Sequence, residues 1–416
     1  MKSFILSCLL SISIFSGLQA QQSETLRKDI QTLIVRVDDD WERPPVADMD
    51  KNEHIVIRFD QLSHDYHRFE YVIRHCNADW KPSSLNEIDY LRGFNNNPIE
   101  EYSTSINTIM EYTHYTLRIP NEQVQLTQSG NYEVLIYDED DGEHPVAIAR
   151  FALQDNKVRI AAQVSGNTDI DFNQTHQQVS LSVSYKGLTV RNPQQELKLL
   201  VRQNRRIDNQ VNQLNPSYVS DGFVRYEHNR NLIFDAGNEY RKFEMLSYYH
   251  DGMGIDKIAR YGDYYHATLY VGHPRTNYIY DEDQDGAFLI RCDNSSDPNT
   301  EADYMLVHFA FDDNNTPILG GDIYVQGEFT SNALTEPYRM AFNKDIGCYE
   351  SIQLMKQGFY NYQYVFKPSD GGKVTTQPTE GNFYQTENQY EIYVYYRPFG
   401  ARADSLVGFL TIKYKQ

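Results

Sequence analysis

Cysteine and tryptophan are scarce in this sequence, which has four cysteines and two tryptophans among 416 residues. Beyond the first twenty residues only Cys76, Cys292 and Cys348 remain, and three thiols allow at most one internal bridge. Their spacing fits neither a metal motif nor a disulfide framework. We therefore expect small buried thiols, although one bridge among them stays open, and stability that comes from core packing.

Long apolar runs and basic residues are also in short supply. After the N-terminus, no segment resembles the roughly 20 consecutive apolar residues that cross a bilayer as a helix. There are 38 Lys and Arg against 58 Asp and Glu, which gives a net charge of -20. Such a surface repels phosphate backbones, so nucleic-acid binding is not expected. With 33 tyrosines and 20 phenylalanines, the chain is too aromatic to be disordered.

The N-terminus has the pattern of a secretory signal peptide over residues 1–20. Lys2 supplies a positive start, an apolar stretch runs from Phe4 to Phe15, and Gly17 to Ala20 form a small-residue exit. Cleavage is expected after Ala20. Removal of Lys2 would change the net charge from -20 to -21. The mature chain is therefore expected to be a soluble protein on the far side of the inner membrane.

Regular stretches alternate between apolar and polar residues with period two, which is the period of a β-strand. Clear examples are residues 54–59, 69–73, 132–136 and 390–394. Turn pairs such as Asp-Gly and Gly-Gly recur between them. Residues 194–214 are the best helix candidate, but their first half also alternates, so a strand is predicted there. Many short strands separated by turns indicate β-sandwiches.

The length favours about three domains, since a domain has roughly 150 residues. A polar stretch at residues 154–157 follows one predicted strand, and a longer polar run covers residues 293–303. These two stretches predict domains at residues 21–155, 156–300 and 301–416. The predicted fold class is all-β, with tandem sandwich domains after a cleaved signal peptide.

Ser129-Gly130-Asn131-Tyr132 opens a predicted strand in the first domain. The string resembles the tyrosine corner of immunoglobulin-like sandwiches, where a Tyr at the start of a late strand bonds to nearby backbone. We therefore expect the first domain to be immunoglobulin-like and the Tyr132 hydroxyl to find a backbone partner.

His75 and Cys76 stand beside each other and raise the question of a cysteine nucleophile. Such a nucleophile needs a base within hydrogen-bond reach, but neighbouring strand residues point to opposite faces. His75 is in phase with Phe69, Tyr71 and Ile73. We expect a hydrogen-bonded core histidine, with Asn77 and Asp79 as turn formers.

Asp281, Asp283 and Asp285, followed by Gly286, match the first half of a calcium loop. Position 12 of such a loop requires a bidentate Glu, and Cys292 stands there. An acidic hairpin turn is favoured, and a calcium site stays open as the alternative. Residues 138–142 are interpreted as a second solvated acidic turn. No serine-histidine-aspartate elbow, phosphate-binding glycine loop or paired-histidine metal motif occurs.

Several strings, taken together and in order, resemble the plug proteins of the type IX secretion system. In the first domain they are His75-Cys76-Asn77-Ala78-Asp79-Trp80, Tyr90-Leu91-Arg92-Gly93-Phe94, Ile99-x-x-Tyr102-x-x-Ser105-x-Asn107-Thr108, Tyr112-Thr113-His114-Tyr115, Ile119-Pro120-Asn121 and Ser129-Gly130-Asn131-Tyr132. In the second they are Asn192-Pro193-Gln194-Gln195-Glu196, Gln203-Asn204 and Gly237-Asn238-Glu239-Tyr240-Arg241-x-Phe243. The likeness covers roughly residues 25–415. Ala149 departs from the pattern, which has a second Arg there.

The third domain resembles early-set sandwiches related to glycogen-binding modules. Val325-Gln326-Gly327-Glu328-Phe329 and Gln357-Gly358-Phe359-Tyr360 carry this likeness. The tryptophan that usually follows the Gly-x-Phe segment is missing. Tyr360, Tyr362 and Tyr364 are therefore expected on one strand face in the core rather than as a sugar platform.

The resemblance to plug proteins implies a non-enzymatic periplasmic protein without cofactor, metal or small-molecule substrate. Its implied partner is the large outer-membrane β-barrel translocon, whose periplasmic opening it closes. Two alternatives remain: a carbohydrate-binding protein with exposed aromatics in a row, and a glycoside hydrolase with two carboxylates about 5 to 9.5 Å apart. The sequence does not identify the residues that contact the barrel.

Overall fold

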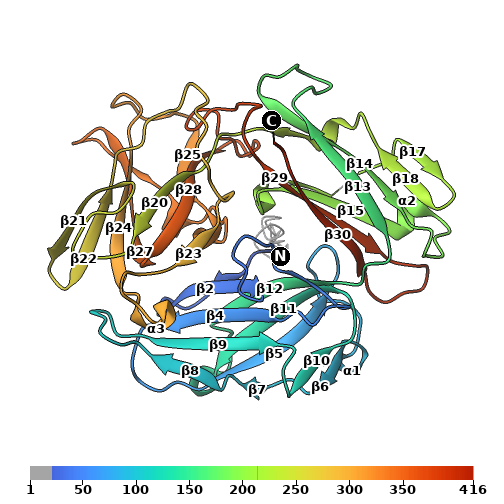
Figure 1. Ribbon diagram of the computed structural model, residues 1–416, viewed down its shortest axis with the longest axis horizontal. Coiled ribbons are helices and arrows are strands. Elements are labelled where there is room, and N and C mark those ends of the chain that lie inside the picture. Colours follow the sequence, from blue (N-terminus) through green and yellow to red (C-terminus); the bar gives the residue numbers. More distant parts are fainter. Residues whose placement is uncertain (1–20, 213, 416) are drawn as a thin grey trace, which may run out of the picture.

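The computed structural model describes residues 21–212 and 214–415. The expected signal peptide, residues 1–20, lies outside the described residues. Strands dominate the described chain and form three β-sandwiches grouped around a common centre (Figure 1). The predicted all-β sandwich class is thereby confirmed. No helix among the described residues is long and apolar enough to cross a membrane.

The first sandwich is built from residues 21–155. One sheet contains β1 (Glu24–Thr25), β3 (Val46–Asp48), β5 (Phe69–Cys76), β7 (Asn97–Pro98), β11 (Gly130–Asp138) and β12 (Ala147–Gln154). The other contains β2 (Ile30–Val37), β4 (Ile55–Gln61), β8 (Glu101–Thr104) and β9 (Thr113–Ile119). Helix α1 (Glu87–Tyr90) precedes a small ribbon of β6 (Leu91–Gly93) and β10 (Val124–Leu126). Both sheets contribute to one buried apolar core.

The second sandwich draws its strands from two distant parts of the chain. One sheet contains β13 (Arg159–Ser165), β14 (His176–Ser184), β17 (Tyr218–Ser220), β18 (Phe223–Tyr226) and β19 (Ile233–Asp235). The other contains β15 (Leu197–Gln203), β16 (Gln210–Val211), β29 (Gln389–Tyr396) and β30 (Ser405–Lys413). In the segment predicted as helix or strand, a single turn, α2 (Pro193–Glu196), leads directly into β15, as the alternation predicts.

The third sandwich is formed by the stretch of sequence between those two parts of the chain. One layer contains β20 (Arg241–Met245), β23 (Phe288–Ile290), β25 (Gly321–Gln326) and β28 (Gly358–Pro368). The other contains β21 (Ile255–Tyr261), β22 (Tyr264–Leu269), β24 (Tyr304–Phe311), β26 (Ala341–Asn343) and β27 (Cys348–Lys356), and α3 (Pro298–Glu301) precedes β24. Short 3-10 turns occupy Glu139–Asp141, Ile207–Asn209, Arg230–Leu232, Glu328–Thr330 and Glu336–Tyr338. Tyr360, Tyr362 and Tyr364 are all buried in the core, as predicted.

The strand pairing differs from the expected division at residue 300. β15 pairs with β29, and β20 pairs with β28, so both sheets join residues on opposite sides of that point. The polar run at residues 293–303 is an interface rather than a linker. Thr300 accepts a hydrogen bond from the Ile106 amide, and Asp303 accepts two from Ile109 and Met110. The Asp303 side chain, at the end of the run, thus satisfies two backbone amides of the first sandwich.

The tyrosine corner predicted in the first sandwich is present. The Tyr132 hydroxyl donates to the Gln128 carbonyl at 2.7 Å. Gly130 has a φ of 146°, and a Cβ there would lie 2.3 Å from His75 Nε2. The turn therefore requires glycine, because any side chain would strain the backbone and collide with the histidine.

Candidate functional site

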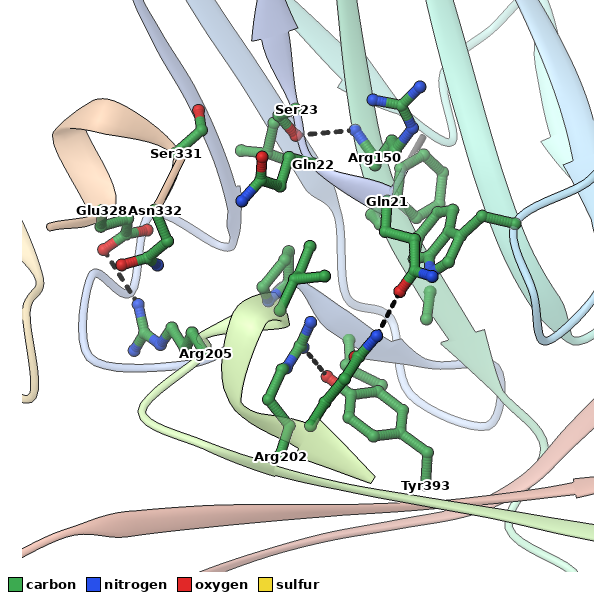
Figure 2. Close-up of a pocket in the computed structure, with 18 of the residues that line it drawn as sticks. Gln21, Gln22, Ser23, Arg150, Arg202, Arg205, Glu328, Ser331, Asn332 and Tyr393 are labelled. Carbon is green, nitrogen blue, oxygen red and sulfur yellow. Dashed lines mark hydrogen bonds and ion pairs between the residues drawn. The ribbon is translucent and has the colours of Figure 1, made fainter. Parts of the chain in front are cut away.

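A cavity of about 120 Å³ lies where the three sandwiches meet (Figure 2). The first sandwich contributes residues 21–23 to its wall, the second contributes Arg202 and Tyr393, and the third contributes Glu328 and Asn332. Figure 2 shows Arg202 and Tyr393 across the cavity from residues 21–23. Any shift of one sandwich against another would therefore change this cavity.

Arg205 joins all three sandwiches through one guanidinium group. Its Nη1 lies 3.0 Å from Glu328 Oε2 in the third sandwich. Its Nη2 donates to the Glu42 carbonyl of the first sandwich at 2.5 Å, and both nitrogens reach the Trp41 carbonyl at 3.4 to 3.5 Å. The planar guanidinium has five donors in a fixed fork, so it can hold several acceptors at once. Arg205 thus contacts every sandwich at the place where the three meet, which we call the junction.

The first described residues of the chain are held inside the junction. The Gln21 side-chain oxygen accepts from Gln210 Nε2 at 2.6 Å, and Ser23 Oγ accepts from the Arg150 amide at 2.9 Å. The expected cleavage point after Ala20 immediately precedes these residues. A chain cut there would begin at the centre of the three sandwiches.

The charged groups of the cavity wall are paired within the protein. Arg202 donates to Glu391 at 2.7 Å and to the Tyr393 hydroxyl at 2.5 Å. Burial alone would lower the pKa of Arg202, but Glu391 raises it above its ordinary value. Arg150 pairs with Glu133 at 2.9 Å. Among the described residues that line the cavity there is no cysteine, histidine or lysine. The wall combines paired ions, apolar side chains and uncharged polar side chains such as Gln21, Gln210 and Asn332.

A buried ion pair fastens the first sandwich to the third. The Asp60 carboxylate of β4 accepts three hydrogen bonds. They come from Lys356 Nζ of β27 at 2.6 Å, from His114 Nδ1 at 2.6 Å and from the Tyr304 hydroxyl at 2.7 Å. Both charged side chains are 1% exposed. Lys356 Nζ also lies 4.0 Å from the centre of the Tyr112 ring. Burial alone would raise the pKa of Asp60, but Lys356 and His114 hold it below its ordinary value.

A second set of buried contacts fastens the first sandwich to the second. Asp404, the residue before β30, accepts a hydrogen bond from the Ala78 amide at 3.0 Å and another from Lys198 Nζ at 2.8 Å. The Tyr395 hydroxyl donates to Asn131 Oδ1 at 2.9 Å. A separate apolar cluster fills this interface with Val46 and Ala152 from the first sandwich and Leu200, Tyr393, Tyr395 and Leu406 from the second.

Carboxylates with raised pKa lie where the second and third sandwiches meet. Asp285 faces Lys413 Nζ of β30 at 3.4 Å, and burial raises the pKa of Asp285 to about 6. Glu239 accepts from the Tyr278 hydroxyl at 2.7 Å and from the Glu387 amide at 3.2 Å. Burial raises the pKa of Glu239 to about 7, so this carboxyl changes charge near neutral pH.

His75 and Cys76 do not form a catalytic pair. His75 Nδ1 lies 3.0 Å from Ser83 Oγ and its Nε2 lies 3.2 Å from the Ser129 carbonyl. This is the hydrogen-bonded core histidine that the alternation predicts, and burial lowers its pKa. Burial also raises the pKa of Cys76 to about 12, which leaves the thiol protonated. The cysteines of the described residues are free: Cys76, Cys292 and Cys348.

The carboxylates of the calcium-like string have separate partners. Asp281 pairs with Lys242 at 2.6 Å, Asp283 accepts the Tyr240 amide, and Asp285 faces the lysine described above. Within the described chain, these three do not form a group with ligand atoms close together. A turn is present, with Asp285 buried and in a left-handed conformation at a φ of 54°. The predicted hairpin is not formed, because β23 pairs with β28 and no strand precedes the turn in the loop of residues 270–287.

At the second acidic turn, residues 138–142, two carboxylates and a histidine that could bind a metal ion lie close together. Ligand atoms of His67, Asp138 and Asp140 all lie within 4.8 Å of one another. Arg27 already occupies one Asp138 oxygen at 2.7 Å, and His67 Nδ1 lies 3.1 Å from that oxygen. The group is held together by its own ion pairs, and Asp138 is buried rather than solvated.

The residues that tie the sandwiches together have no recognisable motif in the sequence. Asp60 and Lys356 are separated by 296 positions, and Arg205 and Glu328 by 123. Charged residues at strand ends and loops are ordinary in a β-protein. Only the tertiary arrangement distinguishes these from solvent-exposed charges.

Two comparisons with known proteins gave matches. Residues 30–155 match the family model described as "Type 9 secretion system plug protein 1st domain". The chain is also similar to a solved hypothetical protein from Parabacteroides merdae ATCC 43184, with 43% sequence identity and a TM-score of 0.92. That similarity covers 95% of this chain and 99% of the other. A search among curated proteins gave no match.

Proposed function

Because the chain belongs to the type 9 secretion system plug protein family, we propose that it is a non-enzymatic plug in the periplasm. In this proposal it binds the large outer-membrane β-barrel translocon of that system and closes its periplasmic opening. The observation that carries the proposal is the family match over the first sandwich. The expected secretory signal is consistent with a periplasmic location.

The physical demands on a plug fit the architecture. A barrel wide enough for folded cargo would leak small solutes when idle, so a stopper must be broad and must not deform. The three sandwiches are tied pairwise by buried contacts at Asp60, Asp404 and Asp285, and Arg205 touches all of them. Together with the apolar cluster between the first and second sandwiches, such ties favour a fixed arrangement of the modules.

The acidic surface gives the proposed contact an electrostatic component. The net charge of -21 expected after removal of residues 1–20 (-20 for the full sequence, less Lys2) would complement a basic rim at the pore mouth. Exposed charge pairs are screened by salt, with a Debye length of about 8 Å at physiological ionic strength. Binding should therefore weaken as salt rises, which suits a contact that must be released.

The two alternatives receive less support. Tyr360, Tyr362 and Tyr364, on the segment that resembles glycogen-binding modules, are no more than 5% exposed and cannot stack on a sugar. The central cavity has paired ions rather than the two separated carboxylates of a glycoside hydrolase. We therefore retain the plug as the proposed function.

Affinity purification from the cell envelope tests this function. The tagged mature protein is purified in a detergent that preserves outer-membrane complexes, and its partners are identified by mass spectrometry. We expect recovery of a very large outer-membrane barrel, with less recovered at high salt. A matched tagged periplasmic protein of similar acidity serves as the control. Failure to recover any barrel under these conditions would contradict the proposal.

A further inference from the structure

A long irregular loop on the third sandwich displays two neighbouring apolar side chains. Residues 270–287 connect β22 to β23 without a regular strand or helix. Near its middle, Ile279 is 76% exposed and Tyr280 is 59% exposed. Single exposed apolar residues need no explanation. Tyr270 and Val271, at the start of the same loop, are also exposed, at 60% and 46%, but Ile279 and Tyr280 are held by buried anchors on both sides. Long ordered loops in compact domains are commonly functional.

The loop is anchored firmly on the N-terminal side of these two residues. Arg275 donates to Glu380 at 2.7 Å and to the Glu239 carbonyl at 2.6 Å. The Tyr278 hydroxyl donates to the Glu239 carboxylate at 2.7 Å. Glu239 and Glu380 are both buried, so these anchors reach into the protein interior.

The C-terminal side of the loop is anchored as well. The Asp283 carboxylate accepts the Tyr240 amide, and the Gln284 amide donates to Asn361 Oδ1 at 2.6 Å. Asn361 is fully buried. Ile279 and Tyr280 are therefore presented by a fixed backbone, which lowers the entropy cost of using them in a contact.

The surroundings of the two residues are acidic. The pKa of the Tyr280 hydroxyl is raised above its ordinary value. The largest cause is Glu387, followed by burial, Glu282, Glu239 and Asp281. The neighbouring Lys242 is already paired with Asp281 at 2.6 Å. Beside Ile279 lies a hollow of about 170 Å³, lined by Asn238, Arg275, Thr276, Asn277 and Ile279. The surface combines an apolar projection, a hollow and a negative rim.

We propose that Ile279 and Tyr280 are the central anchor of a contact with a protein surface that has an apolar pocket rimmed by Lys and Arg. This inference rests on the proposed function, because the partner we assign to the surface is the periplasmic rim of the translocon barrel. Aromatic anchors at the centre of a polar rim carry most of the energy in protein contacts. The carboxylates around Tyr280 supply the charge that such a basic rim complements.

Two double variants separate this surface from the rest of the molecule. I279S/Y280S removes the proposed anchor, and I170S/F172S is the matched control. Ile170 and Phe172 are 53% and 67% exposed, and they lie in the second sandwich. Each full-length variant is expressed in the cell envelope, and the barrel recovered by affinity purification is quantified against wild type. Thermal unfolding of each purified variant verifies that the fold is retained.

Loss of the anchor should lower barrel recovery about tenfold or more, while the control retains wild-type recovery. E282K/E387K should also lower recovery at low salt and flatten its dependence on salt. Equal recovery with I279S/Y280S and wild type, or with E282K/E387K and wild type, would overturn the inference and leave the plug function standing. If wild type itself recovers no barrel, the proposed function fails, and this inference fails with it.

Discussion

Asp60 lies at the interface of the first and third sandwiches with a buried lysine as its partner. In Asp60→Asn, the buried Lys356 loses the carboxylate 2.6 Å away, and the burial that lowers the pKa of Lys356 is no longer opposed by that carboxylate. Removing one member of a buried ion pair costs about 3 to 5 kcal/mol. We expect the free energy of unfolding to fall by that amount, as measured by urea denaturation at neutral pH.

Asp79→Asn is the control for this loss, because Asp79 is 52% exposed and pairs with Lys81 at 3.1 Å. Exposed pairs of this kind contribute about 0 to 1 kcal/mol. Equal effects of the two substitutions would show that the buried pair does not fasten the sandwiches.

Glu239 makes stability depend on pH in an unusual direction. Because burial raises its pKa to about 7, the folded protein keeps a proton that the unfolded chain loses near its ordinary pKa of 4.5. Stability from this group is therefore present at low pH and is lost as pH rises toward 7. Glu239→Gln should flatten the dependence between pH 5 and 8 and should stabilise the protein at pH 8 by on the order of 3 kcal/mol.

Thermal unfolding of wild type and Glu239→Gln across that pH range measures this difference. Asp285, whose pKa is raised to about 6, contributes in the same direction in both proteins. Burial raises the pKa of the neighbouring Asp283 and Glu239 raises it further, so the difference between the two proteins includes that effect of Glu239. Parallel curves for the two proteins would mean that Glu239 is ionised in the folded state at all these pH values.

Single residues of the junction could not be predicted from the sequence. In β4, Ile55, Ile57 and Phe59 alternate inward and predict the core correctly. The same alternation predicts that Asp60 points toward solvent. It is buried only because the third sandwich covers that face through β27. Period two reports which face of a strand is buried by its own sheet and says nothing about a second module.

At the scale of elements, the local pattern was a reliable guide to strands. The stretches at residues 54–59, 69–73, 132–136 and 390–394 all lie in strands of the structure, with a one-residue difference at the first. The tyrosine corner was predicted because it depends on a short turn. The structure does not divide at residue 300 as predicted. β15 pairs with β29, which lies about 190 residues later in the chain, and no local sequence pattern indicates such a pairing.

The tyrosine corner makes its own prediction. Tyr132→Phe removes the hydrogen bond from the buried Tyr132 side chain to the carbonyl of the exposed Gln128. Loss of such a bond costs about 0.5 to 1.5 kcal/mol, because water can replace the donor at an exposed carbonyl. We expect a matching decrease in the free energy of unfolding, with Tyr66→Phe near wild type because Tyr66 is 64% exposed. If Tyr132→Phe leaves the free energy of unfolding unchanged, the corner does not stabilise the first sandwich.

At the scale of the whole molecule, Arg205 is the residue whose loss should loosen the contact of all three sandwiches at once. Arg205→Ala removes the contacts to Glu328 and to the carbonyls of Trp41 and Glu42. We expect faster amide hydrogen exchange around residues 41–42 and 328–332, and a loss of about 2 kcal/mol or more in unfolding free energy. Hydrogen exchange detected by mass spectrometry measures the first effect directly.

Arg225→Ala is the matched control, since Arg225 is 45% exposed and pairs with Glu227 within the second sandwich. Unchanged exchange at the junction in Arg205→Ala would contradict the view that one guanidinium ties the three modules. A rigid body is what the proposed plug needs, so this experiment also bears on function.

The central claim is that the protein closes a wide channel by filling its opening. Entry of a large antibiotic into cells is the most direct measurement, comparing a deletion strain, the same strain with the wild-type gene restored, and the parent. We predict faster entry after deletion and a return to the parental rate on restoration. Equal entry in all three strains would contradict the account, because a channel that stays closed without the protein is closed by something else.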